Sequence, residues 1–101
     1  MSESAPSLAT VYARSDRMVG RRIADEFVIV PILSRGADAD AIFNLNRVGA
    51  FIWERLDGGT AGDAIVVALL ERFDVDREQA ENDYRAFLAQ LLEIGAIAPA
   101  G

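Results

Sequence analysis

The segment AIFNLNRVGAFIWERLDGG, residues 41–59, contains the change of periodicity that decides the fold. Its first part, residues 41–45, joins the β-branched Ile42 to the aromatic Phe43, and both side chains suit a pleated surface. We therefore predict a short strand at residues 41–45. Our hypothesis for this strand is that one of its edges is exposed, and an exposed edge can accept a further strand.

The second part of the segment follows a helical pattern. Asn46 is a good N-cap, and the helix is expected to run from Arg47 to Leu56. Gly58 and Gly59 are of the type usually found beyond a helix end, so we predict that they stop this helix. Its apolar stripe consists of Val48, Phe51, Ile52 and Leu56.

Two more strand candidates precede this segment, at residues 18–24 and 27–33. They flank a short turn that lacks glycine. The second candidate is apolar at nearly every position, which is typical of a strand buried on both faces. Pro31 cannot donate a hydrogen bond to a neighbouring strand, so it should lie near a strand end or at a bulge. Residues 34–40 have the composition of a loop.

Two helices are predicted to follow. Thr60 is the expected N-cap of a helix at residues 61–73, and Asp76 is the expected N-cap of a helix that reaches Ile94. Gly95 should end the last helix. The helix at residues 61–73 is apolar around more of its circumference than a surface helix needs. It is therefore either enclosed on more than one side or in contact with another protein.

Three strands followed by three helices are typical of an α+β domain. The length of 101 residues suits one domain with a modest core. We assign residues 16–98 to this domain. Residues 1–15 are small and polar and are predicted to form a flexible tail, and residues 99–101 form a second, shorter tail.

The composition argues against catalysis and metal binding. The chain has no cysteine and no histidine, so it lacks a thiol nucleophile and the commonest general base and metal ligand. We expect no enzyme activity, no metal and no cofactor. The net charge is −6, which disfavours nucleic acid and anionic membranes as partners. Because we recognise no signal peptide and no bilayer-spanning segment, we expect a cytoplasmic location.

The order and spacing of these motifs resemble the PqqD-like family, whose members are also called peptide recognition elements of ribosomal peptide maturation. A hairpin precedes F-x-L-N, then G-x-x-I-W-E-x-L-D-G-G-T, then a capped helix with D-x-x-x-A-x-x-D-x-x-x-F-L-x-x-L. The match covers residues 18–97. It resembles the stand-alone partners of lasso-peptide or radical-enzyme maturases more than the PQQ-pathway protein. The matching residues are Phe43, Leu45, Asn46, Gly49, Ile52, Trp53, Glu54, Leu56, Asp57, Gly58, Gly59, Thr60, Asp76, Ala80, Asp83, Phe87, Leu88, Leu91 and Gly95.

The resemblance implies a winged-helix-like fold, with a three-stranded antiparallel sheet packed against three helices. Family members bind the leader part of a precursor peptide, which adds as a strand beside the third strand and places side chains in a groove against the third helix. The resemblance also implies delivery of that peptide to a separate modifying enzyme, of the radical SAM, cyclase or leader-peptidase type. Carried onto this chain, the peptide-binding residues are Ala41, Ile42, Phe43, Asn44 and Leu45 on the strand, and Glu81, Tyr84, Arg85 and Leu88 on the helix.

Several of these residues also have a purely structural interpretation. Phe43 and Leu45 suit the core better than a peptide contact. Tyr84 lies on the buried stripe, but its hydroxyl needs a polar partner, so a core position and a groove position both remain open. Glu81 and Arg85 can form an i,i+4 pair on a solvated face.

Two other functions belong to different classes. A winged helix invites DNA binding, but the helix from Asp76 to Ile94 carries more carboxylates than arginines, which is a poor electrostatic match to a duplex. A dimerising or scaffolding module, such as a homodimer, would use the apolar surface of residues 61–73. Trp53 lies at the edge of its helix stripe and is open to core packing or to a partner contact.

Overall fold

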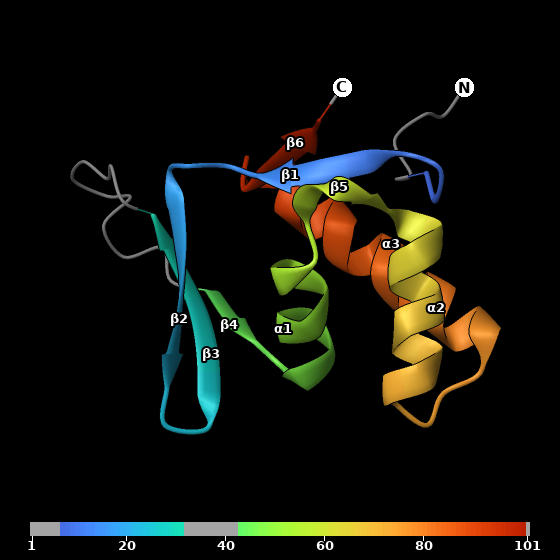
Figure 1. Ribbon diagram of the computed structural model, residues 1–101. Helices are drawn as coiled ribbons and strands as arrows, with labels where there is room; N and C mark the ends of the chain where they lie inside the picture. Colours follow the sequence, from blue (N-terminus) through green and yellow to red (C-terminus); the bar gives the residue numbers. More distant parts are fainter. Residues whose placement is uncertain (1–6, 32–42, 101) are drawn as a thin grey trace.

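The computed structural model describes residues 7–31 and 43–100. They form three helices and two three-stranded antiparallel sheets, which confirms the α+β class (Figure 1). The strands are β1 (Val11–Arg14), β2 (Met18–Ile23), β3 (Glu26–Pro31), β4 (Phe43–Leu45), β5 (Asp57–Ala61) and β6 (Ile97–Pro99). The helices are α1 (Arg47–Glu54), α2 (Gly62–Arg72) and α3 (Arg77–Glu93).

The first sheet has the order β2-β3-β4 and contains the three predicted strands. Ile23 lies opposite Glu26, so the hairpin turn has two residues, and Ala24 adopts a positive φ of 56° there. β4 pairs with β3 on one side, and no other described strand lies beside it. The predicted open edge is therefore confirmed for residues 43–45. Residues 41 and 42 lie outside the described residues.

A second sheet, with the order β5-β1-β6, was not predicted. In it Tyr12 lies opposite Pro99 and Arg14 opposite Ile97. The predicted tail at residues 1–15 is therefore wrong for residues 11–14, and the short tail at residues 99–101 is wrong for Pro99. The physical reason is that the partners of this four-residue strand lie far away in the sequence, so no local pattern reveals the pairing.

The glycine pair after α1 does not stop that helix. α1 ends at Glu54, and Gly58 and Gly59 lie in β5 instead. Gly58 has a φ of 82°, which bends the chain. The Asp57 carboxylate accepts hydrogen bonds from the Gly59 N–H at 2.9 Å and from the Thr60 hydroxyl at 3.3 Å. These two bonds hold the pKa of Asp57 below its usual value.

The N-cap prediction for α2 is also wrong. Ala61, rather than Thr60, is the N-cap residue, and its side chain makes no capping bond. The Asp63 N–H donates to the carbonyl of Leu8 at 2.8 Å, and the Gly62 N–H donates to the carbonyl of Thr10 at 3.4 Å. The segment leading into β1 thus satisfies helix donors that a cap side chain would otherwise serve.

The caps of the other two helices are confirmed. The Asn46 side chain accepts a hydrogen bond from the Gly49 N–H, and the Asp76 side chain accepts one from the Gln79 N–H, both at 2.8 Å. Gly95 follows the end of α3 with a φ of 74°, as expected for a helix stop.

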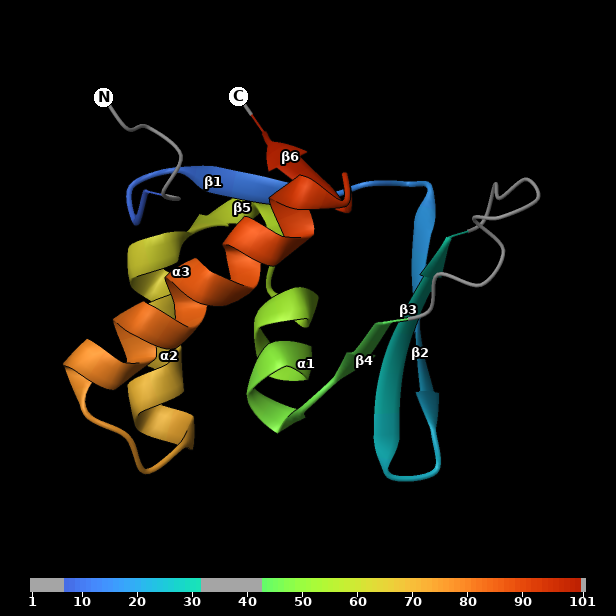
Figure 2. The same cartoon turned by 180° about the vertical axis from the view of Figure 1, so that it is seen from behind.

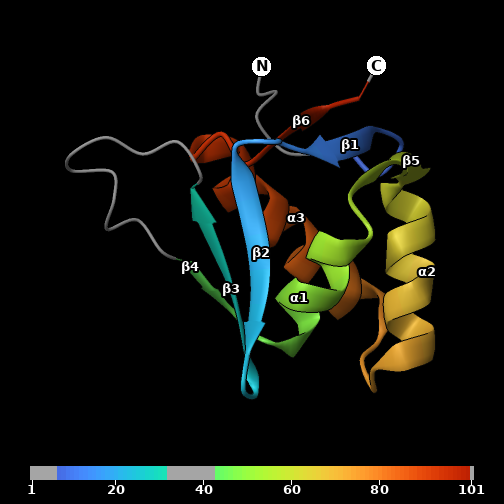
Figure 3. The same ribbon diagram turned by 60° about the vertical axis from the view of Figure 1, so that its left-hand side comes forward.

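The core lies between the two sheets and the helices. α1 occupies the middle, with the β2-β3-β4 sheet on one side of it and α2 and α3 on the other (Figures 1 and 3). Trp53 is 3% exposed and belongs to the core, and Val66 of α2 is fully buried whereas Val67 is 43% exposed. The wide apolar arc of α2 is therefore largely enclosed within the molecule. The largest fully buried side chains are those of Tyr84, Ile29, Ile52, Leu56, Ile65, Leu69, Leu88 and Val66.

Candidate functional site

A groove lies between the open edge of β4 and the C-terminal half of α3, on the side of the molecule seen in Figure 2. We call it the β4–α3 groove, and its volume is about 440 Å³. It adjoins a strand edge whose outward backbone groups are not paired with any described strand. The lining residues are Phe43, Asn44, Leu45, Phe87, Gln90, Leu91, Glu93 and Ile94.

The periodicities of the two elements explain this lining. Side chains alternate along a strand, so Phe43 and Leu45 are half-buried against the core while Asn44 between them is exposed. On α3, Phe87 and Leu91 are four residues apart and therefore share one side of the helix. The groove thus has an apolar floor, and polar side chains, including those of Asn44 and Glu93, stand at its margin.

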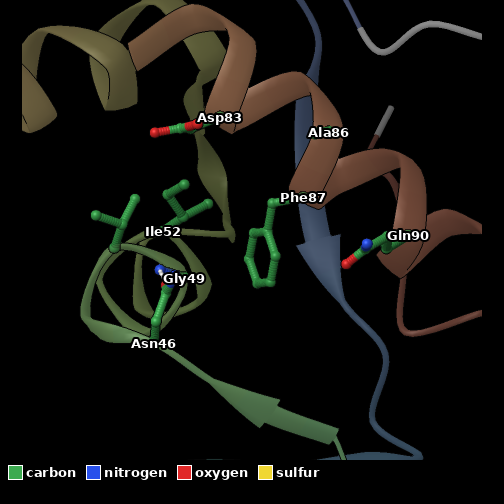
Figure 4. A pocket seen from close by; sticks show the side chains of 8 residues that line it. Asn46, Gly49, Ile52, Asp83, Ala86, Phe87 and Gln90 are labelled. Carbon is green, nitrogen blue, oxygen red and sulfur yellow. Dashed lines mark hydrogen bonds between the residues drawn. The ribbon is translucent and has the colours of Figure 1, made fainter. Parts of the chain in front are cut away.

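A second, smaller depression adjoins the first. It has a volume of about 260 Å³ and lies between α1 and α3 (Figure 4). Phe87 and Gln90 line both depressions, and the Phe87 ring points from α3 toward the start of α1. The ring lies close to Gly49, where a Cβ would stand 3.4 Å from Phe87 Cε1, about van der Waals contact. Phe87 therefore stands between two hollows that together run along α3.

Three of the predicted site residues line the groove, namely Phe43, Asn44 and Leu45. Ala41 and Ile42 lie outside the described residues.

The four predicted α3 residues do not line the groove. Tyr84 and Leu88 are 0% exposed and belong to the core. Glu81 and Arg85 are half-buried and form the predicted i,i+4 pair at 3.7 Å, and Arg77 also bonds Glu81 at 2.8 Å. That these four residues contact a peptide stays a prediction. The side of α3 that faces β4 differs from the side that carries them.

The hydroxyl of Tyr84 also departs from expectation. It is buried and has no hydrogen-bond partner among the described residues. Burial raises the pKa of Tyr84 to about 12, and the nearby Tyr12 and Asp63 add to this effect. The ring packs closely on the start of α2, since a Cβ on Gly62 would lie 2.7 Å from the Tyr84 hydroxyl oxygen.

Sequence reasoning missed four groove residues on α3 and the residue that follows it: Phe87, Gln90, Leu91, Glu93 and Ile94. Phe87 and Leu91 lie at helical spacing with Tyr84 and Leu88 and belong with them to the apolar stripe of α3. The stripe is wide, however, and its pattern does not say which part meets β4 and which part meets α2. The sequence signal that could have identified these residues is the pair Phe87 and Leu88. Two adjacent large apolar side chains widen the apolar arc of the helix beyond the part that Leu88 occupies.

The groove offers binding surface and little chemistry. No group of three or more metal-ligating side chains occurs among residues 7–31 and 43–100. No helix in the described part of the chain is long and apolar enough to cross a membrane. The titratable group in the lining is the carboxylate of Glu93. The arrangement can therefore hold an extended apolar segment.

Comparison with known proteins agrees with this architecture. Residues 26–97 match the family described as "Coenzyme PQQ synthesis protein D (PqqD)". A chain solved as "TbiB1 in Complex with the TbiA(beta) Leader Peptide" is 32% identical, with a TM-score of 0.69, and the match covers 84% of this chain and 93% of that one.

A chain solved as "Lasso peptide synthetase B1 complexed with the leader peptide" has the same fold, with a TM-score of 0.72 at 22% identity. That match covers 88% of this chain and 99% of the other. No curated protein matches the sequence. The sequence match over residues 26–97 and the similarity to TbiB1 show that this chain belongs to the PqqD family.

Proposed function

We propose that this protein binds the leader segment of a ribosomally made precursor peptide and presents it to a separate modifying enzyme. The leader adds as a strand to the open edge of β4, and its side chains enter the β4–α3 groove. The observation that carries the proposal is the edge of β4, beside which no described strand lies, next to an apolar groove of about 440 Å³. The similar TbiB1 chain was solved in complex with a leader peptide, which supports the same class of ligand.

The physics of strand addition suits this site. Main-chain hydrogen bonds along an edge give affinity for any extended chain, whereas pockets for alternate side chains give specificity. Every second side chain of an added strand points the same way. Side chains on that face of the leader would meet Phe87 and Leu91, and those on the other face would remain outside the groove.

The expected affinity follows from three contributions. Each main-chain hydrogen bond adds about 0.5–1.5 kcal/mol net. Each apolar side chain buried in the groove adds roughly 1.5–3 kcal/mol. Association itself costs at least about 4 kcal/mol. A few main-chain bonds and two buried anchors therefore give affinities between the micromolar and nanomolar ranges.

The protein is proposed to act without catalysing a reaction itself. The groove lining contains apolar side chains, two amides and one carboxylate, which can hold a peptide but do not form a nucleophile with its base. The chemistry would then lie with the modifying enzyme, and this chain would contribute the capture of the leader.

The test is a titration with the TbiA(beta) leader, the peptide bound by the similar TbiB1 chain. Leaders N-methylated at successive positions lose one main-chain donor at a time. An added strand predicts that affinity falls at alternate positions and is retained between them, because only every second N–H faces β4. The substitution Asn44→Pro, which removes a donor from β4, provides a protein-side check, and a thermal melt establishes whether that variant folds.

Two results would contradict the proposal. A uniform effect of N-methylation along the leader would exclude strand addition. A second test is a leader in which every side chain on the face toward the groove is replaced by alanine. Full affinity of this leader would exclude the β4–α3 groove as the specificity site.

A further inference from the structure

A second surface lies on a different side of α1 from the groove. We call it the arginine–phenylalanine face, and it borders a depression of about 300 Å³ between β2, α1 and the end of α2, elements that stand at the front of Figure 3. It shares no lining residue with the β4–α3 groove or with the hollow between α1 and α3. The depression is lined by Arg22, Arg47, Ala50, Phe51, Glu54, Arg55, Arg72 and Phe73, and the face is named after the arginines and phenylalanines among them.

The two phenylalanine rings hold the guanidinium groups in place. The rings of Phe51 and Phe73 pack edge to face, with centroids 5.4 Å apart. Arg55 lies 3.5 Å from the Phe51 ring centroid and donates a hydrogen bond to the Phe51 carbonyl at 3.1 Å. Arg47 and Arg72 approach the Phe73 ring at 5.9 Å and 5.3 Å. Cation–π contacts therefore order three positive charges before any ligand arrives.

The charge balance of this face is unusual for the chain. The protein has a net charge of −6, yet four of its ten arginines line this one depression. Arg22 pairs with Glu54 at 3.7 Å. Within residues 7–31 and 43–100, no carboxylate lies within 4.0 Å of Arg47, Arg55 or Arg72.

The arginines of α3 provide a contrast. Arg77 pairs with Asp63 and Glu81, and Arg85 pairs with Glu81. Those charges are balanced within the chain. The charges on the arginine–phenylalanine face are incompletely balanced by described residues, so this face attracts an external anion.

The chemistry of the face selects the kind of anion. A guanidinium is a planar fork that bonds carboxylates and phosphates in a bidentate manner. The half-buried rings of Phe51 and Phe73 add apolar surface between the forks. A segment that alternates carboxylates with apolar side chains matches both properties.

A nucleic acid matches less well, because its phosphates extend beyond this small patch. Beyond the patch, the acidic remainder of the chain would repel them.

We propose that the arginine–phenylalanine face docks a segment of a second protein in which aspartate or glutamate alternates with apolar residues. This inference rests on the proposed function, since that second protein is the enzyme that receives the leader. The position of the face fits the role: the groove can hold a peptide while the other side of α1 contacts the enzyme.

The probe is a short synthetic peptide with the repeat Glu-Glu-Leu, titrated into the full chain and followed by NMR through the arginine Nε–H signals. Its matched control is the repeat Gln-Gln-Leu, and random duplex DNA is the third ligand. We expect the glutamate peptide to shift the signals of Arg47, Arg55 and Arg72, with an affinity that decreases as salt is added.

Two double variants localise the binding. Arg47→Gln/Arg72→Gln removes two exposed charges from the face, and Arg77→Gln/Arg85→Gln makes the same charge change on α3. We expect the first pair to weaken binding of the glutamate peptide about tenfold, because each lost fork removes a charge-assisted contact, and the second to leave it nearly unchanged. Thermal melts establish that both variants fold.

Several outcomes would overturn the inference. These are equal binding of the glutamine peptide, equal weakening by both double variants, tighter binding of duplex DNA than of the glutamate peptide, and absence of any shift. A parallel titration with the leader separates this inference from the proposed function. Failure of the leader to bind, with the acidic peptide still bound at this face, would reject the leader-delivery function and leave the carboxylate site in place.

Discussion

Among single residues, Tyr84 combines complete burial with a hydroxyl that lacks a partner in the described part of the chain. Such an unpaired polar group costs about 1–3 kcal/mol. We predict that Tyr84→Phe raises the free energy of unfolding by about 1 kcal/mol, because the ring stays in place while the unpaired group is removed. Urea denaturation at neutral pH measures this change. If Tyr84→Phe instead lowered the free energy of unfolding by about 1 kcal/mol, the hydroxyl would be hydrogen-bonded in solution.

The same residue predicts a pH dependence. The folded protein raises the pKa of Tyr84 from 10.0 to about 12, so the stability linked to this group is complete below pH 10. Above pH 10 the unfolded chain ionises first, and the free energy of unfolding falls, by up to roughly 2 kcal/mol, as the pH approaches 12. Tyr84→Phe should lack this part of the fall. Identical pH profiles of wild type and Tyr84→Phe would contradict the prediction.

Among the elements, α3 contributes side chains both to the core and to the lining of the β4–α3 groove. Phe87 lines both depressions and is only half-buried, so its truncation should affect the ligand more than the fold. We predict that Phe87→Ala weakens leader binding at least about tenfold, since one apolar anchor is lost. Isothermal calorimetry measures this. The control is Val67→Ala on the exposed side of α2, and a similar loss in both variants would argue against the groove.

The elements also show what sequence patterns can and cannot reveal. The caps at Asn46 and Asp76 were predictable, because a cap is made by residues three positions apart. The start of α2 was not, because the carbonyls that accept its first N–H groups belong to Leu8 and Thr10.

The same limit applies to the candidate site. The local pattern predicted the strand β4, whereas its open edge was a hypothesis that the family resemblance placed at residues 41–45. The side of α3 that faces β4 depends on how helix and sheet are packed, and the apolar stripe through Leu88 and Phe87 is compatible with several rotations of the helix. Sequence reasoning therefore named β4 residues that line the groove and α3 residues that do not, and contact of either set with a peptide stays a prediction.

Across the entire chain, the second sheet is the largest departure from the prediction, and Tyr12 is its most buried contribution from β1. It is 6% exposed and belongs to the hydrophobic core. We predict that Tyr12→Ala lowers the free energy of unfolding by about 3 kcal/mol, because a large aromatic side chain leaves a cavity. Chemical denaturation measures the loss, and Tyr12→Phe is the matched control. A change below the experimental error would restore the interpretation of residues 11–14 as a tail.

The position of β1 between β5 and β6 has a consequence for how the protein is made. Synthesis proceeds from the N-terminus, so Val11–Arg14 leave the ribosome before either partner strand exists. The β2–β3 hairpin can form from neighbouring residues, whereas the β5-β1-β6 sheet is complete only when Ile97–Pro99 have emerged. β1 can pair with β5 once Asp57–Ala61 have emerged, but the edge of β1 that pairs with β6 stays open until nearly all of the described residues have been translated.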